Sequence, residues 1–235
     1  MARFRGNSTN RKKYFSATNS LILINVVVFF AFISLQIASA FRGDSLQGFL
    51  ESWIVLNPSL FFKGRIWTLL TSMFMHGGFT HLFVNMISLF FIGSFVEKLI
   101  GRKRFIWFYL ISGLVAGLFF VVLAYFGSAF PFTYRFFGDL STSAVGASGA
   151  IFGLGGLLAL LLPRLPVLVF FILPMPLWVA MVFLLFGLWV VSAAFGLPIG
   201  NTAHLGGLVV GVLYGWYLRT KYSKKVEMLG RMFRQ

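Results

Sequence analysis

Long apolar runs without a charged residue constrain this chain more than any other feature of its sequence. Of its 235 residues, 59% are apolar and only 11% are charged, and a water-soluble domain of this size does not need so much apolar surface. Runs able to cross a bilayer as helices are predicted at roughly Leu21–Ala40, His81–Val96, Phe105–Phe126, Ser148–Leu162, Leu177–Phe195 and Ala203–Leu218. The sequence therefore predicts an all-α membrane protein, built as a bundle of six transmembrane helices.

Basic residues set the orientation that we expect for this bundle. The net charge is +15, but the basic residues cluster between the apolar runs, so membrane topology explains them better than a nucleic-acid surface. Six spans with inward termini place sixteen Lys and Arg residues on the inner side and four on the outer side. We expect a basic cytoplasmic arm at residues 1–20, the membrane domain at 21–218 and a basic cytoplasmic tail at 219–235. The expected location is the plasma (inner) membrane.

Two connections between the predicted spans have features that are not typical of simple loops. The segment Phe41–Gly78 is long and rich in aromatic residues, so we expect it to lie partly in the membrane interface. The segment Pro163–Pro176 is apolar but contains four prolines, which do not fit inside one helix. We interpret it as an interfacial loop, with Pro176 in the first turn of the fifth span.

Polar side chains are rare inside the predicted spans, which makes those present candidates for function. They fall in three groups, around His81, Ser148 and His204, all near the starts of even-numbered spans. These three residues lie fifteen to seventeen positions before the basic residue that ends each span. That spacing puts them at one level, about 22 to 26 Å above the inner boundary.

A serine and a histidine at one depth on neighbouring helices can act as nucleophile and general base, because the imidazole accepts the hydroxyl proton. The chain has five acidic residues and none is placed to orient His204, which favours a Ser-His dyad over a triad. Ser148 starts a helix, so its own N–H and the side chains of His81 and Asn85 can form an oxyanion hole. Phe152 follows one turn after Ser148 and is expected to pack against His204.

Plainer explanations exist for each of these features. A single intramembrane serine often bonds to its own helix, and a single histidine often makes one interhelical hydrogen bond. Gly146, Gly149 and Gly207 are expected to remove side chains where helices approach closely. A metal site made by the chain's three histidines is a weaker alternative, because no acidic ligand is available at that depth. We therefore expect no metal and no cofactor.

At these residues the sequence resembles the rhomboid intramembrane serine proteases. The family's three signature segments are matched in order, on the second, fourth and sixth predicted helices, by His81-x-x-x-Asn85, Gly146-x-Ser148-Gly149 and Ala203-His204-x-x-Gly207. The resemblance covers the chain from Leu21 to Leu218. One departure is that Trp67 is followed by Thr68, where family members often have Trp-Arg, and that the nearby basic residue is Arg65.

The resemblance implies a serine endopeptidase that hydrolyses peptide bonds in or near the transmembrane segments of membrane-protein substrates. It implies that Ser148 is the nucleophile, that His204 is the general base, and that mobility near the fifth helix admits substrate. The implied partners are transmembrane substrates and the lipid bilayer, not nucleic acid. A catalytically silent relative that binds or escorts membrane clients is the alternative. A small transporter is disfavoured because the sequence has no internal repeat.

Overall fold

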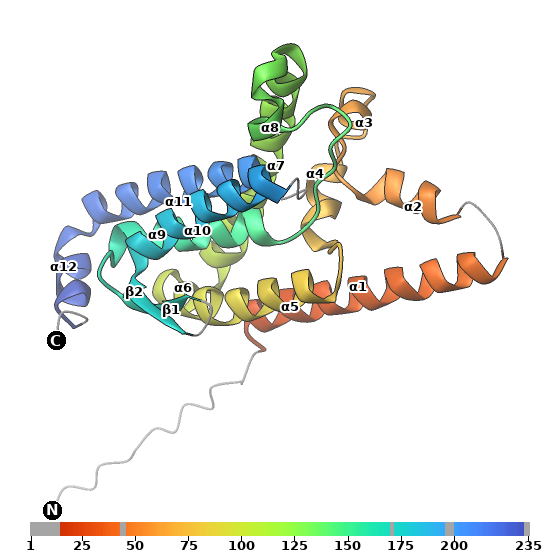
Figure 1. Cartoon of the computed structure of the whole chain (residues 1–235). Helices are drawn as coiled ribbons and strands as arrows, with labels where there is room; N and C mark the ends of the chain where they lie inside the picture. The colour runs from red at the N-terminus through yellow and green to blue at the C-terminus, as the bar shows by residue number, and fades with distance from the viewer. Residues whose placement is uncertain (1–14, 43–45, 170–171, 196–199, 233–235) are drawn as a thin grey trace, which may run out of the picture.

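Six long helical segments coincide with the six predicted runs. The computed structural model describes residues 15–42, 46–169, 172–195 and 200–232 (Figure 1). The long segments are α1 (Ala17–Arg42), α5 (Phe79–Ser88) continued through the π-helical turn η2 (Leu89–Gly93) into α6 (Ser94–Ile100), α7 (Arg102–Ala129), α9 (Ser148–Leu161), α10 (Leu177–Phe195) and α11 (Asn201–Lys221). The chain is thus a helical membrane protein.

Four of these segments are long and apolar enough to cross a bilayer: α1, Phe79–Ile100, α7 and α10, counted over the residues that the structure describes. The other two, α9 and α11, occupy the centre of the bundle. Every residue of α9 from Gly149 to Leu158 is buried, and α11 buries several glycines together with Asn201 and His204. Helices that face protein instead of lipid do not need an apolar surface all round, which explains their lower hydropathy or shorter length.

Glycines let α9 and α11 approach closely. A Cβ atom on Gly207 would overlap the carbonyl oxygen of Gly149, and one on Gly211 would overlap that of Gly153. Helix α7 packs against this crossing too, because a Cβ on Gly149 would lie 2.6 Å from the Cβ of Ala116 in α7. The backbones of α9 and α11 are therefore in direct contact, as in small-residue packing of membrane helices.

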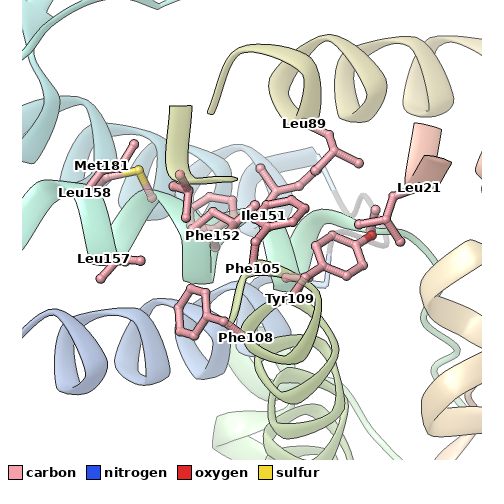
Figure 2. Packing of buried hydrophobic residues seen from close by; sticks show 14 of the residues in the cluster. Leu21, Leu89, Phe105, Phe108, Tyr109, Ile151, Phe152, Leu157, Leu158 and Met181 are labelled. Carbon is pink, nitrogen blue, oxygen red and sulfur yellow. The ribbon is translucent and has the colours of Figure 1, made fainter. Parts of the chain in front are cut away.

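Large side chains fill the bundle beside this crossing. Phe105 and Tyr109 of α7 are fully buried, and Figure 2 shows them grouped with Ile151 and Phe152 of α9 and with Leu89. Leu89 belongs to the π-helical turn between α5 and α6. This cluster joins three helical segments into one core, which holds the start of α9 in place.

The described part of the segment Phe41–Gly78 after α1 forms short helices, and its place in the membrane interface stays a prediction. Its described part contains α2 (Leu46–Ile54), α3 (Pro58–Phe62), α4 (Thr68–Thr71) and the 3-10 turn η1 (Ser72–Phe74). The rings of Trp53 and Trp67 stack at 5.1 Å, and the Arg65 guanidinium lies 4.9 Å from the Trp53 ring centre. The Arg65 guanidinium and the Trp67 ring thus both contact Trp53, although Arg65 and Trp67 are not adjacent in sequence.

The same segment positions the loop that leads into α9. Leu56 and Ala144 exchange backbone hydrogen bonds of 3.2 and 2.8 Å, and the Gly146 N–H donates to the Ser72 carbonyl at 2.9 Å. That loop also contains η3 (Pro131–Thr133) and α8 (Tyr134–Phe137) after α7. The residues just before Ser148 are therefore held by backbone hydrogen bonds on their interfacial side.

Two predictions about connections need correction. Pro163–Pro176 is not a plain loop, because β1 (Pro166–Val169) pairs antiparallel with β2 (Leu173–Pro176). Prolines are tolerated in these strands because both strands of a two-stranded hairpin are edge strands, where a missing N–H can face outward. Helix α10 begins at Leu177, so Pro176 ends a strand and does not lie in the first helical turn. The residues after α11 are also helical, as α12 (Ser223–Met232).

Candidate active site

Ser148 and His204 meet at the N-terminal ends of two parallel central helices. Ser148 is the first residue of α9, and His204 lies in the first turn of α11. The Ser148 Oγ is 2.8 Å from the His204 Nε2, although the residues are separated by 56 positions. This is the distance of a strong hydrogen bond between a hydroxyl and an imidazole.

The imidazole of His204 is held mainly by packing. Its ring stacks on that of Phe152, with centroids 4.4 Å apart and planes inclined by 13°. Its other nitrogen, Nδ1, is buried and has no hydrogen-bond partner among the described residues. Because none of the described carboxylates orients the ring there, stacking and the bond to Ser148 hold it in position.

The side chains of His81 and Asn85 converge on Gly146, two residues before Ser148. A Cβ on Gly146 would lie 2.9 Å from the His81 Nε2 and 3.8 Å from the Asn85 Nδ2. Gly146 also has φ of 122°, a conformation that favours glycine. This residue therefore lets the chain pass close to both polar side chains before α9 begins.

Both groups retain hydrogen-bond donors. The Gly77 N–H donates to the His81 Nδ1 at 3.4 Å, which leaves the proton of the neutral ring on Nε2. The Asn85 Nδ2 donates to the His81 carbonyl at 2.9 Å, which uses one of its two hydrogens. Each side chain can thus direct a donor toward the start of α9.

The first amides of α9 provide further donors. The first intrahelical bond at this end is Ile151 N–H to the Ala147 carbonyl, at 3.0 Å, and no side chain caps the helix. The amides before it are the ones that an α-helix leaves without an intrahelical partner. The N–H of Ser148 therefore lies beside its own hydroxyl as a free donor, and the positive end of the helix dipole lies there too.

His76 extends this polar cluster. Its ring contacts that of His81 edge to face, with centroids 5.1 Å apart, and it is buried without a partner for either nitrogen among the described residues. Within the same residues, no group of three His, Cys, Asp or Glu side chains could hold a metal ion.

Sequence reasoning missed two polar residues, one buried in the centre of the bundle and one near its surface. Ser112 of α7 is fully buried, and a Cβ on Gly153 would lie 2.7 Å from its Oγ. The Trp189 Nε1 of α10 donates to the Phe136 carbonyl of α8 at 3.0 Å. A serine or a tryptophan in an apolar helix is unremarkable in a sequence, so no local pattern identified either one.

Comparison with known proteins identifies one family. The model of the Rhomboid domain matches residues 63–221. Rhomboid protein 1, mitochondrial, of Saccharomyces cerevisiae is 31% identical over 225 residues, covering 91% of this chain and 58% of the yeast protein. Rhomboid protease GluP of Bacillus subtilis is 31% identical over 188 residues, covering 77% of this chain and 33% of its own length.

A second bacterial relative is matched over a larger share of its own length than these two proteins. Rhomboid protease AarA of Providencia stuartii is 30% identical over 204 residues, which cover 83% of this chain and 70% of that protein. The Rhomboid domain match includes the residues around His81, Ser148 and His204. The chain belongs to the rhomboid family.

Proposed function

We propose that this protein is an intramembrane serine endopeptidase that cleaves membrane proteins in or near their transmembrane segments, using Ser148 and His204 as a catalytic dyad. The observation that carries the proposal is the 2.8 Å contact between the Ser148 Oγ and the His204 Nε2. Family membership and relatives named as proteases support the reaction class. The protein would need no metal and no cofactor.

In the proposed reaction, the Ser148 Oγ attacks the carbonyl carbon of the substrate peptide and its proton passes to the His204 Nε2. The negative charge that develops on the carbonyl oxygen is stabilised by the Ser148 N–H, His81 and Asn85. His204 then protonates the departing amine. A water molecule, deprotonated by His204, hydrolyses the acyl-enzyme and restores the serine hydroxyl.

The packing of α10 supports substrate entry from its side of the bundle. Within this helix the buried residues are Leu177, Ala180, Met181 and Leu185, all in its first half. The second half exposes apolar side chains such as Val190 and Phe195. A helix attached mainly at one end can move aside at the other, which would let a transmembrane substrate reach Ser148.

Six spans with both termini on the cytoplasmic side complete the proposal. The basic residues favour this orientation, and α9 and α11 would cross within the ring of more apolar helices. Because the chain has no cysteine, single cysteines at Lys225 and Arg135 can be labelled selectively. In intact cells a membrane-impermeant maleimide should label R135C and should label K225C only after lysis. The reverse result would contradict the orientation.

The activity is tested by labelling with a fluorophosphonate probe and by cleavage of a panel of single-span reporters. We expect the wild-type protein to react and the Ser148→Ala variant to lose both labelling and cleavage. Ser112→Ala is the matched control, since it removes another buried serine of the bundle and should remain active. Mass spectrometry of the products would locate the cut.

Two outcomes would count against the dyad. Labelling that survives Ser148→Ala unchanged would exclude Ser148 as the nucleophile. A wild-type protein that binds membrane clients but neither reacts with the probe nor cleaves a reporter would instead be a catalytically silent family member.

A further inference from the structure

Basic side chains gather at one end of the bundle, which we call the basic end. Here α6, α9 and α11 end and α7 begins, and α12 and the β1–β2 hairpin lie at the same end (Figure 1). The described basic residues at this end are Lys98, Arg102, Lys103, Arg104, Arg164, Arg219, Lys221, Lys224, Lys225 and Arg231. Such a concentration of charge favours an anionic partner.

The protein supplies little negative charge to balance this end. The carboxylate of Glu97 accepts hydrogen bonds from Ala17 and Thr18 at the start of α1. The carboxylate of Glu227 pairs with Arg231 at 2.7 Å, and this is the one ion pair among the described residues. Arg164 and Arg219 are left without a carboxylate partner in the described chain, so both are available to an anion from outside it.

These two arginines line a cavity of about 470 Å³ between α12 and the turn that follows α9. The helix contributes Ser223, Val226 and Glu227, which lie on one of its faces. The last residue of α9, Leu161, and the turn after it, with Leu162, Pro163 and Leu165, contribute an apolar floor. The volume falls in the range of small-molecule sites, which is about 300 to 1,000 Å³.

The chemistry of the lining is that of an amphiphile's binding site. Both arginines are exposed, and the Arg219 Nη1 makes only a long contact of 3.4 Å with the Leu160 carbonyl. Their planar guanidinium groups are suited to the oxygens of a phosphate, and the Ser223 hydroxyl is a further donor. The leucines beneath would contact carbon atoms attached to that phosphate.

The composition of α12 favours a place for this cavity at the surface of the membrane. Met228 and Met232 are exposed at 64% and 67%, and they lie on a helix that also carries Lys224 and Lys225. A short helix with exposed apolar and basic residues is typical of an interfacial helix on anionic lipid. The cavity beneath it would then lie level with the lipid headgroups.

We propose that this cavity binds the headgroup of an anionic phospholipid, with Arg164 and Arg219 on the phosphate and the leucines against the glycerol and first acyl carbons. Phosphate recognition between helix ends is a known role of basic pockets in membrane proteins. The bound lipid would join α12 to the turn after α9, and so would attach α12 to the centre of the bundle.

The experiment uses the full chain in phosphatidylcholine nanodiscs doped with phosphatidylglycerol, and native mass spectrometry after release into detergent counts the retained lipids. The wild-type protein should retain phosphatidylglycerol in preference to phosphatidylcholine. The R164Q/R219Q variant should lose about tenfold or more in affinity for phosphatidylglycerol. The K103Q/K224Q variant, which removes equal charge at the same end but outside the cavity, should lose much less.

Further measurements distinguish lipid binding from the binding of soluble phosphate, and a loss of binding from a loss of folding. Glycerol 3-phosphate and inorganic phosphate should not displace the bound lipid, because they lack the acyl carbons. Thermal unfolding in neutral detergent should be alike for both double variants. If R164Q/R219Q does not fold, the single variants R164Q and R219Q should each weaken retention about fivefold. Equal retention by the two double variants, equal retention of the two lipids, or displacement by soluble phosphate would overturn the proposal.

Discussion

The hydroxyl of Thr18 donates a 2.7 Å hydrogen bond to the carboxylate of Glu97, across 79 positions of the sequence. The backbone amides of Ala17 and Thr18 donate to the same carboxylate, at 2.8 Å each. Glu97 thus satisfies donors at the N-terminal end of α1 that the helix itself leaves unpaired. This explains why α1 begins at Ala17, four residues before the predicted Leu21.

Replacing Glu97 with glutamine should destabilise the protein by about 1 to 2 kcal/mol. The amide keeps the shape of the side chain but loses the negative charge and one acceptor oxygen. The measurement is chemical unfolding in detergent micelles. Glu227→Gln is the matched control, because it breaks an exposed ion pair and should cost less than about 0.5 kcal/mol. Equal losses would show that Glu97 does not anchor α1.

Replacing Gly207 with alanine should destabilise the crossing of α9 and α11 by about 1 to 3 kcal/mol or more. The added Cβ would overlap the backbone oxygen of Gly149, and backbone cannot rotate away as a side chain can. Thermal unfolding would measure the loss. Gly187→Ala in α10 is the control, since no atom lies within 4 Å of its added Cβ, and helix propensity predicts a small gain. A Gly207→Ala protein as stable as Gly187→Ala would refute close backbone packing.

Replacing Trp189 with phenylalanine should speed the cleavage of transmembrane reporters by about two- to tenfold. The change removes the indole N–H that donates to the Phe136 carbonyl, and so loosens the half of α10 in which no side chain is fully buried. The measurement is the initial rate of reporter cleavage. Trp178→Phe alters an exposed ring at the other end of α10 and should leave the rate unchanged. A rate for Trp189→Phe no higher than that of Trp178→Phe would argue against opening at this helix.

The stabilising effect of Asp139 should disappear in acid. Hydrogen bonds from the Ser141 side chain, and then from Thr142 and the backbone, lower the pKa of Asp139 below its ordinary value of 3.8. A carboxylate with a lowered pKa in the folded state stabilises that state above the unfolded pKa, and the effect is lost as pH falls through the folded value.

The comparison of Asp139→Asn with the wild type would check this effect. The wild type should have the higher unfolding temperature near neutral pH, and the difference should shrink below about pH 4. A difference that stays constant across this range would mean that the charge of Asp139 does not contribute.

The sequence predicted the helices well because lipid imposes a strong pattern. Helix α10 begins at the predicted residue, Leu177, and is described as far as Phe195, because a long apolar run defines it. The turn between Pro163 and Pro176 was misjudged because strand pairing depends on which backbone groups face a partner, and composition does not reveal that. The start of α1 was missed because its cap is supplied by a residue 79 positions away.

The sequence predicted that the site residues share one depth in the membrane, but it did not predict how their side chains contact one another. Equal spacing from the basic boundaries placed Ser148 and His204 at one level, and the structure brings their side chains to 2.8 Å. Nothing in the sequence could predict that Gly146 takes a φ of 122° and so brings the chain beside His81. Their catalytic roles and the location in the plasma membrane stay predictions.

Helix α9 is too short to cross the hydrocarbon layer of a bilayer, and this determines which of its ends water can reach. Its fourteen residues rise about 21 Å, less than the roughly 30 Å of hydrocarbon that a bilayer contains. Ser148 stands at one end of this helix, and ten successive buried residues follow it. In the proposed reaction, water can therefore reach the Ser148 end of α9 from its own side of the membrane, while the buried remainder of α9 excludes water. Hydrolysis would then consume water without opening a leak for protons or ions.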